Sequence, residues 1–134
     1  MTRRQRQYEF RPPPGASIRV LQNFNDKFFD VASKGDYKET YSRIKAGQDI
    51  NVLHSYLKCS ALQGAIDQGQ RRIVRLLLEQ GADPDLQNGR TGQTALHLCA
   101  RRGDPELMHI LLNAGANRKI EAFDGRLPIQ LAAE

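Results

Sequence analysis

The sequence predicts an all-α fold of stacked helix pairs, and a repeated glycine pattern is the main reason. Gly69 and Gly103 are 34 residues apart, as are Gly81 and Gly115. A fixed period of about 20–50 residues is typical of repeat proteins, in which each unit packs on its neighbours. Apolar residues recur at spacings of three and four between these glycines, which predicts helices rather than strands.

Each unit is predicted to contain two antiparallel helices. In the best-formed copy the first helix runs from about residue 95 to 102 and the second from about 105 to 113. Gly103 ends the first helix, as glycine commonly does. Pro105 lies in the first turn of the second helix, where its missing N–H costs no hydrogen bond. The residues expected to face inward on the first helix are Leu96, Cys99 and Ala100.

Three full copies and one partial copy are expected, at about residues 26–58, 59–92, 93–124 and 125–134. The first copy is degenerate: Gly35 and Gly47 keep the period, but the second helix has few aliphatic residues. A terminal repeat has only one neighbour and needs a soluble face, so we expect an N-terminal cap. The last copy stops after one helix, so we expect a fragment of a longer protein. A natural protein that ends in one stacked helix is the alternative.

The N-terminal part is predicted to differ from the rest. Residues 1–17 are expected to be a disordered, basic, proline-rich tail, and residues 18–134 the repeat domain. Three consecutive prolines from Pro12 cannot continue a helix. Residues 18–24 show no clear period and are expected to pack on the first repeat.

The net charge of +5 is unevenly distributed, because residues 1–11 hold four arginines and one glutamate. Such a tail can contact nucleic acid or an anionic membrane, but a solvated tail is the favoured interpretation. No apolar stretch approaches the roughly 18 residues that span a bilayer. Cys59 and Cys99 predict reduced thiols rather than a disulfide or zinc site. These features together favour a cytoplasmic location, with the nucleus as the alternative.

Residues 26–134 resemble the ankyrin repeat family. Its pattern begins Thr-Pro-Leu-His-x-Ala-Ala, and residues 94–100 read Thr-Ala-Leu-His-Leu-Cys-Ala. Residues 127–133, Leu-Pro-Ile-Gln-Leu-Ala-Ala, keep the proline and both alanines, whereas Ser60-Ala-Leu-Gln lacks the proline and the histidine. The resemblance implies a solenoid of helix-turn-helix units with hairpin-like loops, which acts as a protein-interaction scaffold and is not an enzyme.

The residues themselves offer no catalytic constellation. No Gly-rich phosphate loop, His-Glu-x-x-His or Cys-x-x-Cys motif occurs. His97 is expected to tie its turn by hydrogen bonds, and Cys99 to fill a tight contact between helices. His54 and His109 are expected at the surface. We therefore expect no metal, no cofactor and no small-molecule substrate.

The resemblance also implies that the loop tips and the ends of the first helices line a concave binding face. Arginines are expected to cluster there beside two exposed aromatic residues, and both residue types are frequent at binding hot spots. The hypothesis is that an acidic or phosphorylated segment of a partner protein lies across this face. The alternative is that the arginines only solubilise the surface and that missing residues cover Phe123. The predicted partner-binding residues are Lys34, His54, Tyr56, Gln68, Arg90, Gln93, Arg101, Arg102, Phe123 and Arg126.

Two other functions stay open. The chain could be the regulatory or substrate-recruiting N-terminal domain of a larger enzyme or channel, which is compatible with a scaffold. Binding of nucleic acid or an anionic membrane through the tail ranks third. We expect a monomer, and the identity of the partner does not follow from the sequence.

Overall fold

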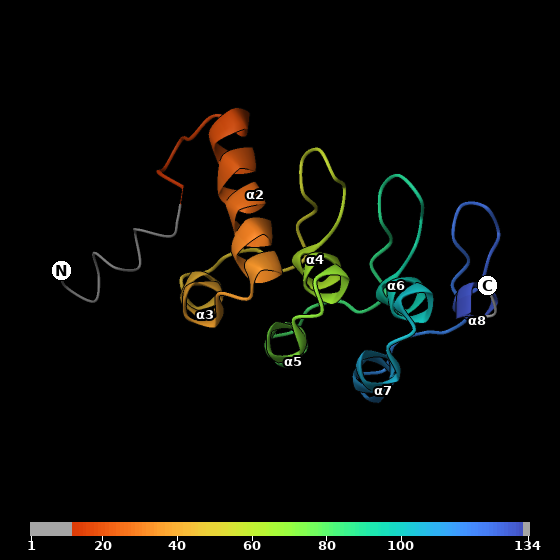
Figure 1. Cartoon of the computed structure of the whole chain (residues 1–134). Coiled ribbons are helices and arrows are strands. Elements are labelled where there is room, and N and C mark those ends of the chain that lie inside the picture. Colours follow the sequence, from red (N-terminus) through yellow and green to blue (C-terminus); the bar gives the residue numbers. More distant parts are fainter. Residues whose placement is uncertain (1–11, 133–134) are drawn as a thin grey trace.

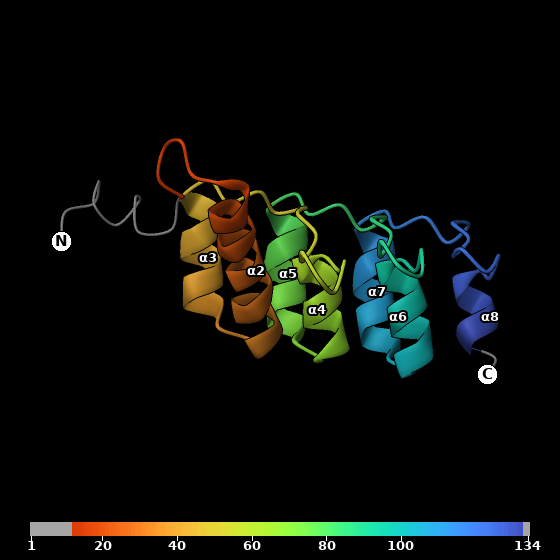
Figure 2. The ribbon, with the colours of Figure 1, turned by 90° about the horizontal axis from the view of Figure 1, so that it is seen from above.

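Helices alternate between two rows in the computed structural model, which describes residues 12–132. Figure 1 shows an inner row of α2, α4, α6 and α8, with hairpin-like loops rising from it, and an outer row of α3, α5 and α7; Figure 2 shows both rows from above. The prediction of an all-α stack of helix pairs is confirmed. The helices are α2 (Ile18–Lys34), α3 (Tyr37–Lys45), α4 (Ala61–Asp67), α5 (Arg71–Glu79), α6 (Ala95–Arg102), α7 (Pro105–Asn113) and α8 (Pro128–Ala132).

The helix ends follow from local capping chemistry. Ser60 begins α4 and Thr94 begins α6, each in a capping box with the residue three positions on. Gly103 ends α6 in the left-handed conformation, with φ of 69°, and lets its N–H return to the carbonyls of Ala100 and Cys99. The Asp104 carboxylate then accepts the N–H of Leu107 at 3.1 Å and begins α7. The predicted bounds of α6 and α7 are confirmed.

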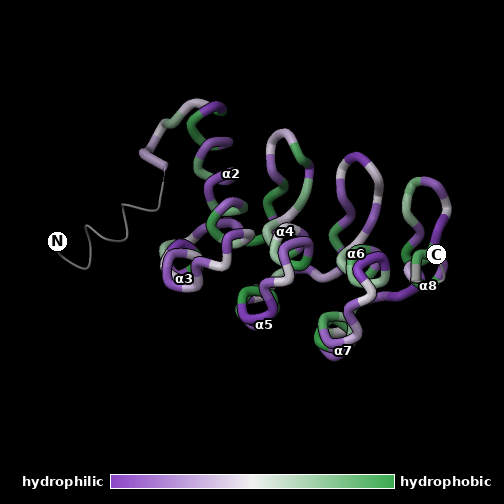
Figure 3. The backbone as a smooth tube through the Cα atoms, in the orientation of Figure 1, coloured by the Kyte–Doolittle hydropathy of each residue, from purple (hydrophilic) through white to green (hydrophobic). Residues whose placement is uncertain are grey.

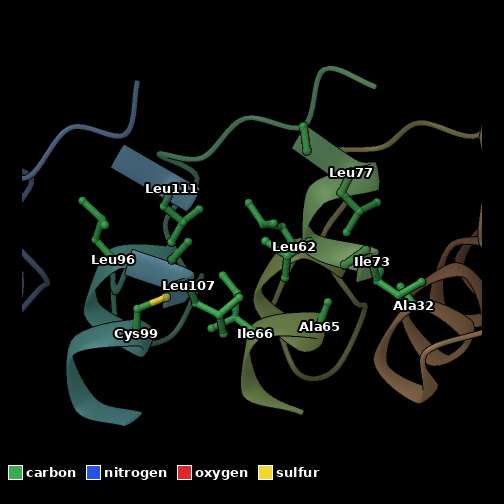
Figure 4. Close-up of a cluster of buried hydrophobic side chains, with 14 of the residues drawn as sticks. Ala32, Leu62, Ala65, Ile66, Ile73, Leu77, Leu96, Cys99, Leu107 and Leu111 are labelled. Carbon is green, nitrogen blue, oxygen red and sulfur yellow. The ribbon is translucent and has the colours of Figure 1, made fainter. Parts of the chain in front are cut away.

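The core runs continuously through the stack. Leu62 and Ile66 of α4 lie between the outer helix α5 and the next inner helix, α6 (Figure 4). Leu96 of α6 holds the position of Leu62, and Cys99 holds that of Ala65; both are buried. Small residues such as Ala65 let neighbouring helices approach closely. Each unit therefore depends on its neighbours for burial of its apolar face.

The α2 helix differs from the other inner helices. It has 17 residues, whereas α4 has 7, and it begins at Ile18 after the N-cap Ser17. Residues 18–24 are thus helical and continue into the first helix of the first pair, which their weak periodicity did not predict. Figure 1 shows α2 rising to the height of the hairpin loops. Of the expected tail at residues 1–17, residues 1–11 lie outside the described residues; in residues 12–17 the Ala16 N–H donates to the Pro13 carbonyl at 3.1 Å, which closes a turn before Ser17.

The α3 helix carries the polar character expected of a cap. Its outer surface is hydrophilic (Figure 3), and two of its buried side chains, Thr40 and Arg43, are polar. The Thr40 hydroxyl donates to the Asp36 carbonyl at 2.7 Å, and Arg43 pairs with Glu39 at 3.1 Å. None of the helices within residues 12–132 has the length and apolar composition that crossing a bilayer requires.

Candidate protein-interaction face

The inner face is the surface formed by α2, α4 and α6 together with the loops that precede α4, α6 and α8. The predicted contact residues come from these elements: the helix ends supply Lys34, Gln68, Arg101 and Arg102, and the loops supply the other six. Their placement on one side of the stack follows from the alternation of the rows. Whether they contact a partner stays a prediction.

Arg101 and Arg102 lie side by side at the exposed end of α6. Arg101 donates from Nη2 to the Gln93 side-chain oxygen at 3.1 Å, and Arg102 donates from Nη1 to the Asp67 carbonyl at 2.7 Å. Both acceptors are neutral, and no ion pair within residues 12–132 involves either arginine. The two guanidinium groups are therefore held in place on the inner face without a direct ion pair, although Arg102 is near enough to Asp104 to lower its pKa.

The Arg90 side chain is hydrogen-bonded to the neighbouring loop of the same chain. Its Nε and Nη2 donate to the Tyr56 carbonyl at 3.1 and 2.7 Å, and its guanidinium lies 4.8 Å from the centre of the Tyr56 ring. This side chain therefore ties one loop tip to the next, and whether Arg90 also contacts a partner stays a prediction. Tyr56 itself stays 69% exposed.

The third loop tip carries Phe123 and Arg126. Phe123 is 67% exposed, although one edge of its ring packs against Gly92 of the preceding loop. Its N–H donates to the Thr91 carbonyl at 2.9 Å. Arg126 pairs with Asp124 at 3.5 Å, so its charge is partly neutralised within the loop.

His54 is not the surface residue that the sequence predicted, because its side chain is only 16% exposed. Its Nδ1 accepts the N–H groups of Tyr56 and Leu57 at 3.1 and 3.0 Å. Its ring meets the Phe29 ring of α2 edge-on, with 5.0 Å between centroids. His54 therefore shapes the first loop from within.

The first loop is fastened to α2 by a carboxylate as well. Asp26 accepts the N–H of Ser55 at 2.8 Å and also accepts its hydroxyl proton. These bonds join segments 29 residues apart, so they hold the loop against α2 in one arrangement.

His97 ties its own turn, as predicted, and also bonds to the next unit, which was not predicted. Its Nδ1 accepts the Thr94 N–H at 3.1 Å, which leaves Nε2 as the donor to the Arg126 carbonyl at 2.9 Å. Gln63 performs the same task one unit earlier: its oxygen accepts the Ser60 N–H, and its nitrogen donates to the carbonyls of Leu86 and Gln93. Glutamine thus replaces histidine without loss of the hydrogen-bond pattern.

A hollow of about 450 Å³ lies on the inner face between α2 and α4. Two of its lining residues, Lys34 and Gln68, are among the contact residues predicted from the sequence. A sequence difference marks this part of the inner face: Gly64 stands in α4 where Leu98 stands in α6, one repeat later. The lining residues that the sequence did not single out as contact residues are Phe29, Ser33, Gly64 and Gln70.

The thiols are poorly suited to chemistry. Burial raises the pKa of Cys99 to about 12, with Asp104 adding to the effect. Burial also raises the pKa of Cys59, although a hydrogen bond from Asn88 opposes the shift. Both thiols therefore stay protonated and weakly nucleophilic near neutral pH. Within the part of the chain that the structure describes, no three His, Cys, Asp or Glu side chains gather to hold a metal ion.

Comparison with known proteins decides the family. The family model described as ankyrin repeats (three copies) matches residues 28–124. The chain belongs to the ankyrin repeat family. Ankyrin repeats are in general protein–protein interaction modules without catalytic activity of their own.

The similar proteins are varied. Human cyclin-dependent kinase inhibitor 2A is 32% identical over 123 residues, which cover 92% of this chain and 76% of that protein. Mouse protein phosphatase 1 regulatory subunit 27 is 32% identical over 105 residues, or 78% of this chain and 67% of that one. The Arabidopsis thaliana E3 ubiquitin-protein ligase KEG is 39% identical over 62 residues, or 46% of this chain. This chain covers only 4% of the length of KEG.

Proposed function

We propose that this ankyrin repeat chain is a scaffold whose inner face binds an extended segment of a partner protein that carries Asp, Glu or phosphate. The observation that carries the proposal is the pair of exposed arginines at the end of α6, Arg101 and Arg102, whose acceptors are neutral. A guanidinium presents donors that match a carboxylate or phosphate in bidentate geometry. Their intramolecular bonds to Gln93 and Asp67 leave further N–H donors available.

The outer row supports this assignment by contrast. Arg71 of α5 pairs with Asp104 at 3.4 Å and with Glu106 at 2.8 Å. That arginine is neutralised by carboxylates of the same chain, so it has little charge to offer a partner. Arg101 and Arg102 form no ion pair within residues 12–132, although Arg102 lies near enough to Asp104 to lower its pKa, and an acidic segment would supply carboxylates in direct contact.

The test is affinity capture from a cell lysate, read by mass spectrometry, with the chain beside its R101E/R102E variant. A matched control, R75E/R118E, makes the same charge change at exposed arginines of α5 and of the loop before α8. We expect partners to be lost with the first variant and kept with the second. Equal retention by both variants would contradict the proposal, provided circular dichroism shows both to be folded.

A second candidate follows from the coverage of the relatives. The similar segment is a small part of KEG, a protein whose name describes a ubiquitin ligase. The chain could correspondingly be a regulatory or substrate-recruiting domain of a larger protein, with the inner face as its recruiting surface. The names of two other relatives describe an inhibitor and a regulatory subunit. Sequencing the full-length transcript distinguishes this candidate from a separate scaffold protein.

Binding of nucleic acid or an anionic membrane through residues 1–11 is the third candidate. Under the scaffold proposal, deleting residues 1–11 changes partner capture little. Binding that disappears with this deletion and weakens with added salt would instead indicate nucleic acid or an anionic membrane as the ligand.

A further inference from the structure

Exposed apolar side chains gather along one edge of the stack. The N-terminal end of α2 and the tips of the three loops rise on the same side, as Figure 1 shows. We call this the tip edge and define it as residues 18–22, 55–58, 89–91 and 121–126. Within residues 12–132, large hydrophobic side chains are exposed at seven positions, and five of these lie on the tip edge: Ile18, Leu21, Tyr56, Leu57 and Phe123.

The most exposed of these side chains project from the surface instead of lining a groove. Ile18 is 75% exposed, Tyr56 69% and Phe123 67%, and none of the three lines the hollow between α2 and α4. They come from separate units, so they follow one another along the edge. Aromatic and aliphatic side chains that project in this way suit the boundary between lipid headgroups and acyl chains, which is flat and deformable.

Cations accompany the apolar side chains. The charged residues of the tip edge are four basic and two acidic side chains: Arg19, Lys58, Arg90, Arg126, Glu121 and Asp124. Arg126 pairs with Asp124 at 3.5 Å, so this pair adds little net charge. Arg19, Lys58 and Arg90 are exposed and form no ion pair within residues 12–132. The edge is therefore basic, and a surface of anionic headgroups complements it.

The loop tips can leave water without losing backbone hydrogen bonds. Every backbone N–H of residues 55–58 and 89–92 donates to an acceptor within the chain. The Phe123 N–H donates to the preceding loop at 2.9 Å, and the Tyr56 carbonyl accepts from the Arg90 guanidinium. Unpaired backbone groups are costly to bury in lipid. The tips thus avoid most of the cost that an ordinary loop would meet at a bilayer.

We propose that the tip edge binds the surface of a bilayer that contains anionic lipids. Tyr56, Leu57 and Phe123 enter the boundary between headgroups and acyl chains, while Lys58 and Arg90 contact the anionic headgroups. Ile18, Leu21 and Arg19 extend the contact to the end of α2. This site goes beyond the scaffold function, because it leaves the ends of the inner helices, with Arg101 and Arg102, open to a partner protein.

The first test places a fluorescent reporter at a tip. The chain has no tryptophan, so F123W introduces a single indole. I129W is the matched control, because Ile129 of α8 is 74% exposed and lies outside the tip edge. The probe is a vesicle of phosphatidylcholine and phosphatidylserine in a ratio of three to one. We expect these vesicles to shift the emission of F123W to shorter wavelength and to leave that of I129W unchanged.

The second test measures how apolar tips and charge affect vesicle affinity, by co-sedimentation. Y56S/F123S should weaken binding at least tenfold. The control Y41S/I129S, at the two exposed apolar positions outside the tip edge, should keep binding within twofold. Circular dichroism checks that both variants are folded.

The charge variants follow the same design. R19E/K58E should weaken binding at least fivefold, whereas K38E/R75E, at exposed cations of the outer row, should keep it within twofold. Vesicles of phosphatidylcholine alone should bind the parent chain at least tenfold more weakly, because the electrostatic attraction is then missing.

Several results would overturn the lipid site. They are an unshifted emission in F123W, an equal shift in I129W, and equal losses of affinity in Y56S/F123S and its control. Vesicle binding that disappears when residues 1–11 are deleted, yet survives Y56S/F123S, would assign the membrane to those residues instead. If the parent chain does not bind vesicles and Y56S/F123S loses captured proteins, the tips belong to a protein partner, and the scaffold function stands without the lipid site.

Discussion

Replacing His97 tests whether the hydrogen bonds of this residue, rather than its ring, join the last two units. H97A removes the acceptor of the Thr94 N–H and the donor to the Arg126 carbonyl. Thr94 is almost fully buried, and a buried unpaired donor costs about 1–3 kcal/mol. The Arg126 carbonyl is nearer to water, so its loss adds about 1 kcal/mol. The free energy of unfolding should therefore fall by about 3 kcal/mol in H97A.

H97Q provides the matched comparison. Gln63 makes the equivalent bonds to Ser60, Leu86 and Gln93 in the preceding unit. H97Q should consequently cost less than about 1 kcal/mol, in the range of an ordinary hydrogen bond that is slightly misplaced.

Urea unfolding followed by circular dichroism at 222 nm measures both variants, and thermal melts provide a second reading. At about 4 °C per kcal/mol for a chain of this size, H97A should melt about 12 °C below the parent. Equal destabilisation by H97Q and H97A would refute the reasoning, because the ring's shape would then matter more than its hydrogen bonds. A loss below about 1 kcal/mol in H97A would refute it as well.

Three further predictions concern the thiols, a helix cap and the close contact of α2. In the native chain, dithionitrobenzoate should modify Cys59 and spare Cys99 until denaturant is added. The rate at Cys99 should not rise between pH 7 and 9, because burial raises the pKa of this thiol to about 12. Rapid modification of both thiols would contradict this. D104A should lower the free energy of unfolding by about 1 kcal/mol at neutral pH, the usual cost of a lost cap, while D104N should retain most of it. The Leu107 N–H and, secondarily, Arg71 lower the pKa of Asp104 below its ordinary value of 3.8. The stability that the charge of Asp104 contributes is therefore present above pH 3.8 and is lost as the pH falls through the lowered pKa of the folded chain. A stability difference between D104A and the parent that stays constant down to pH 2 would contradict this. G64A should destabilise the chain by about 1–3 kcal/mol, because the added methyl group overpacks against Phe29 and Ser33. This loss should occur although alanine favours a helix by about 1 kcal/mol over glycine. A higher melting temperature in G64A would refute the close contact between α2 and α4.

The period of 34 residues was enough to predict the paired helices, because glycine positions and capping residues are local properties of the sequence. Gly103, Asp104 and Pro105 mark a helix boundary that the structure reproduces. The long α2 was not predicted, because its exposed N-terminal half, which includes Ile18 and Leu21, buries little and so has no strong periodicity. Its stability depends on Ser17 as a cap and on distant contacts such as Asp26 with Ser55.

The candidate site was predictable only in outline. The alternation of the rows places all ten predicted residues on elements of the inner face, which the family pattern implied. Which of these side chains keep N–H donors that no residue of the chain occupies depends on contacts between repeat units. Arg90 reaches the Tyr56 carbonyl 34 residues away, and no pattern in the sequence states that this carbonyl is within reach. The hollow at Gly64 likewise depends on how closely α2 packs against α4, which is a property of the stack.

Mapping the footprint of a bound segment tests the central claim most directly. The chain, labelled with nitrogen-15, is titrated with the captured partner segment, and the amide shifts are followed by nuclear magnetic resonance. The account predicts changes at the ends of α2, α4 and α6 and in the loops beside them, with Arg101 and Arg102 among the residues affected. Changes confined to α3, α5 and α7 would place binding on the outer row and contradict the account.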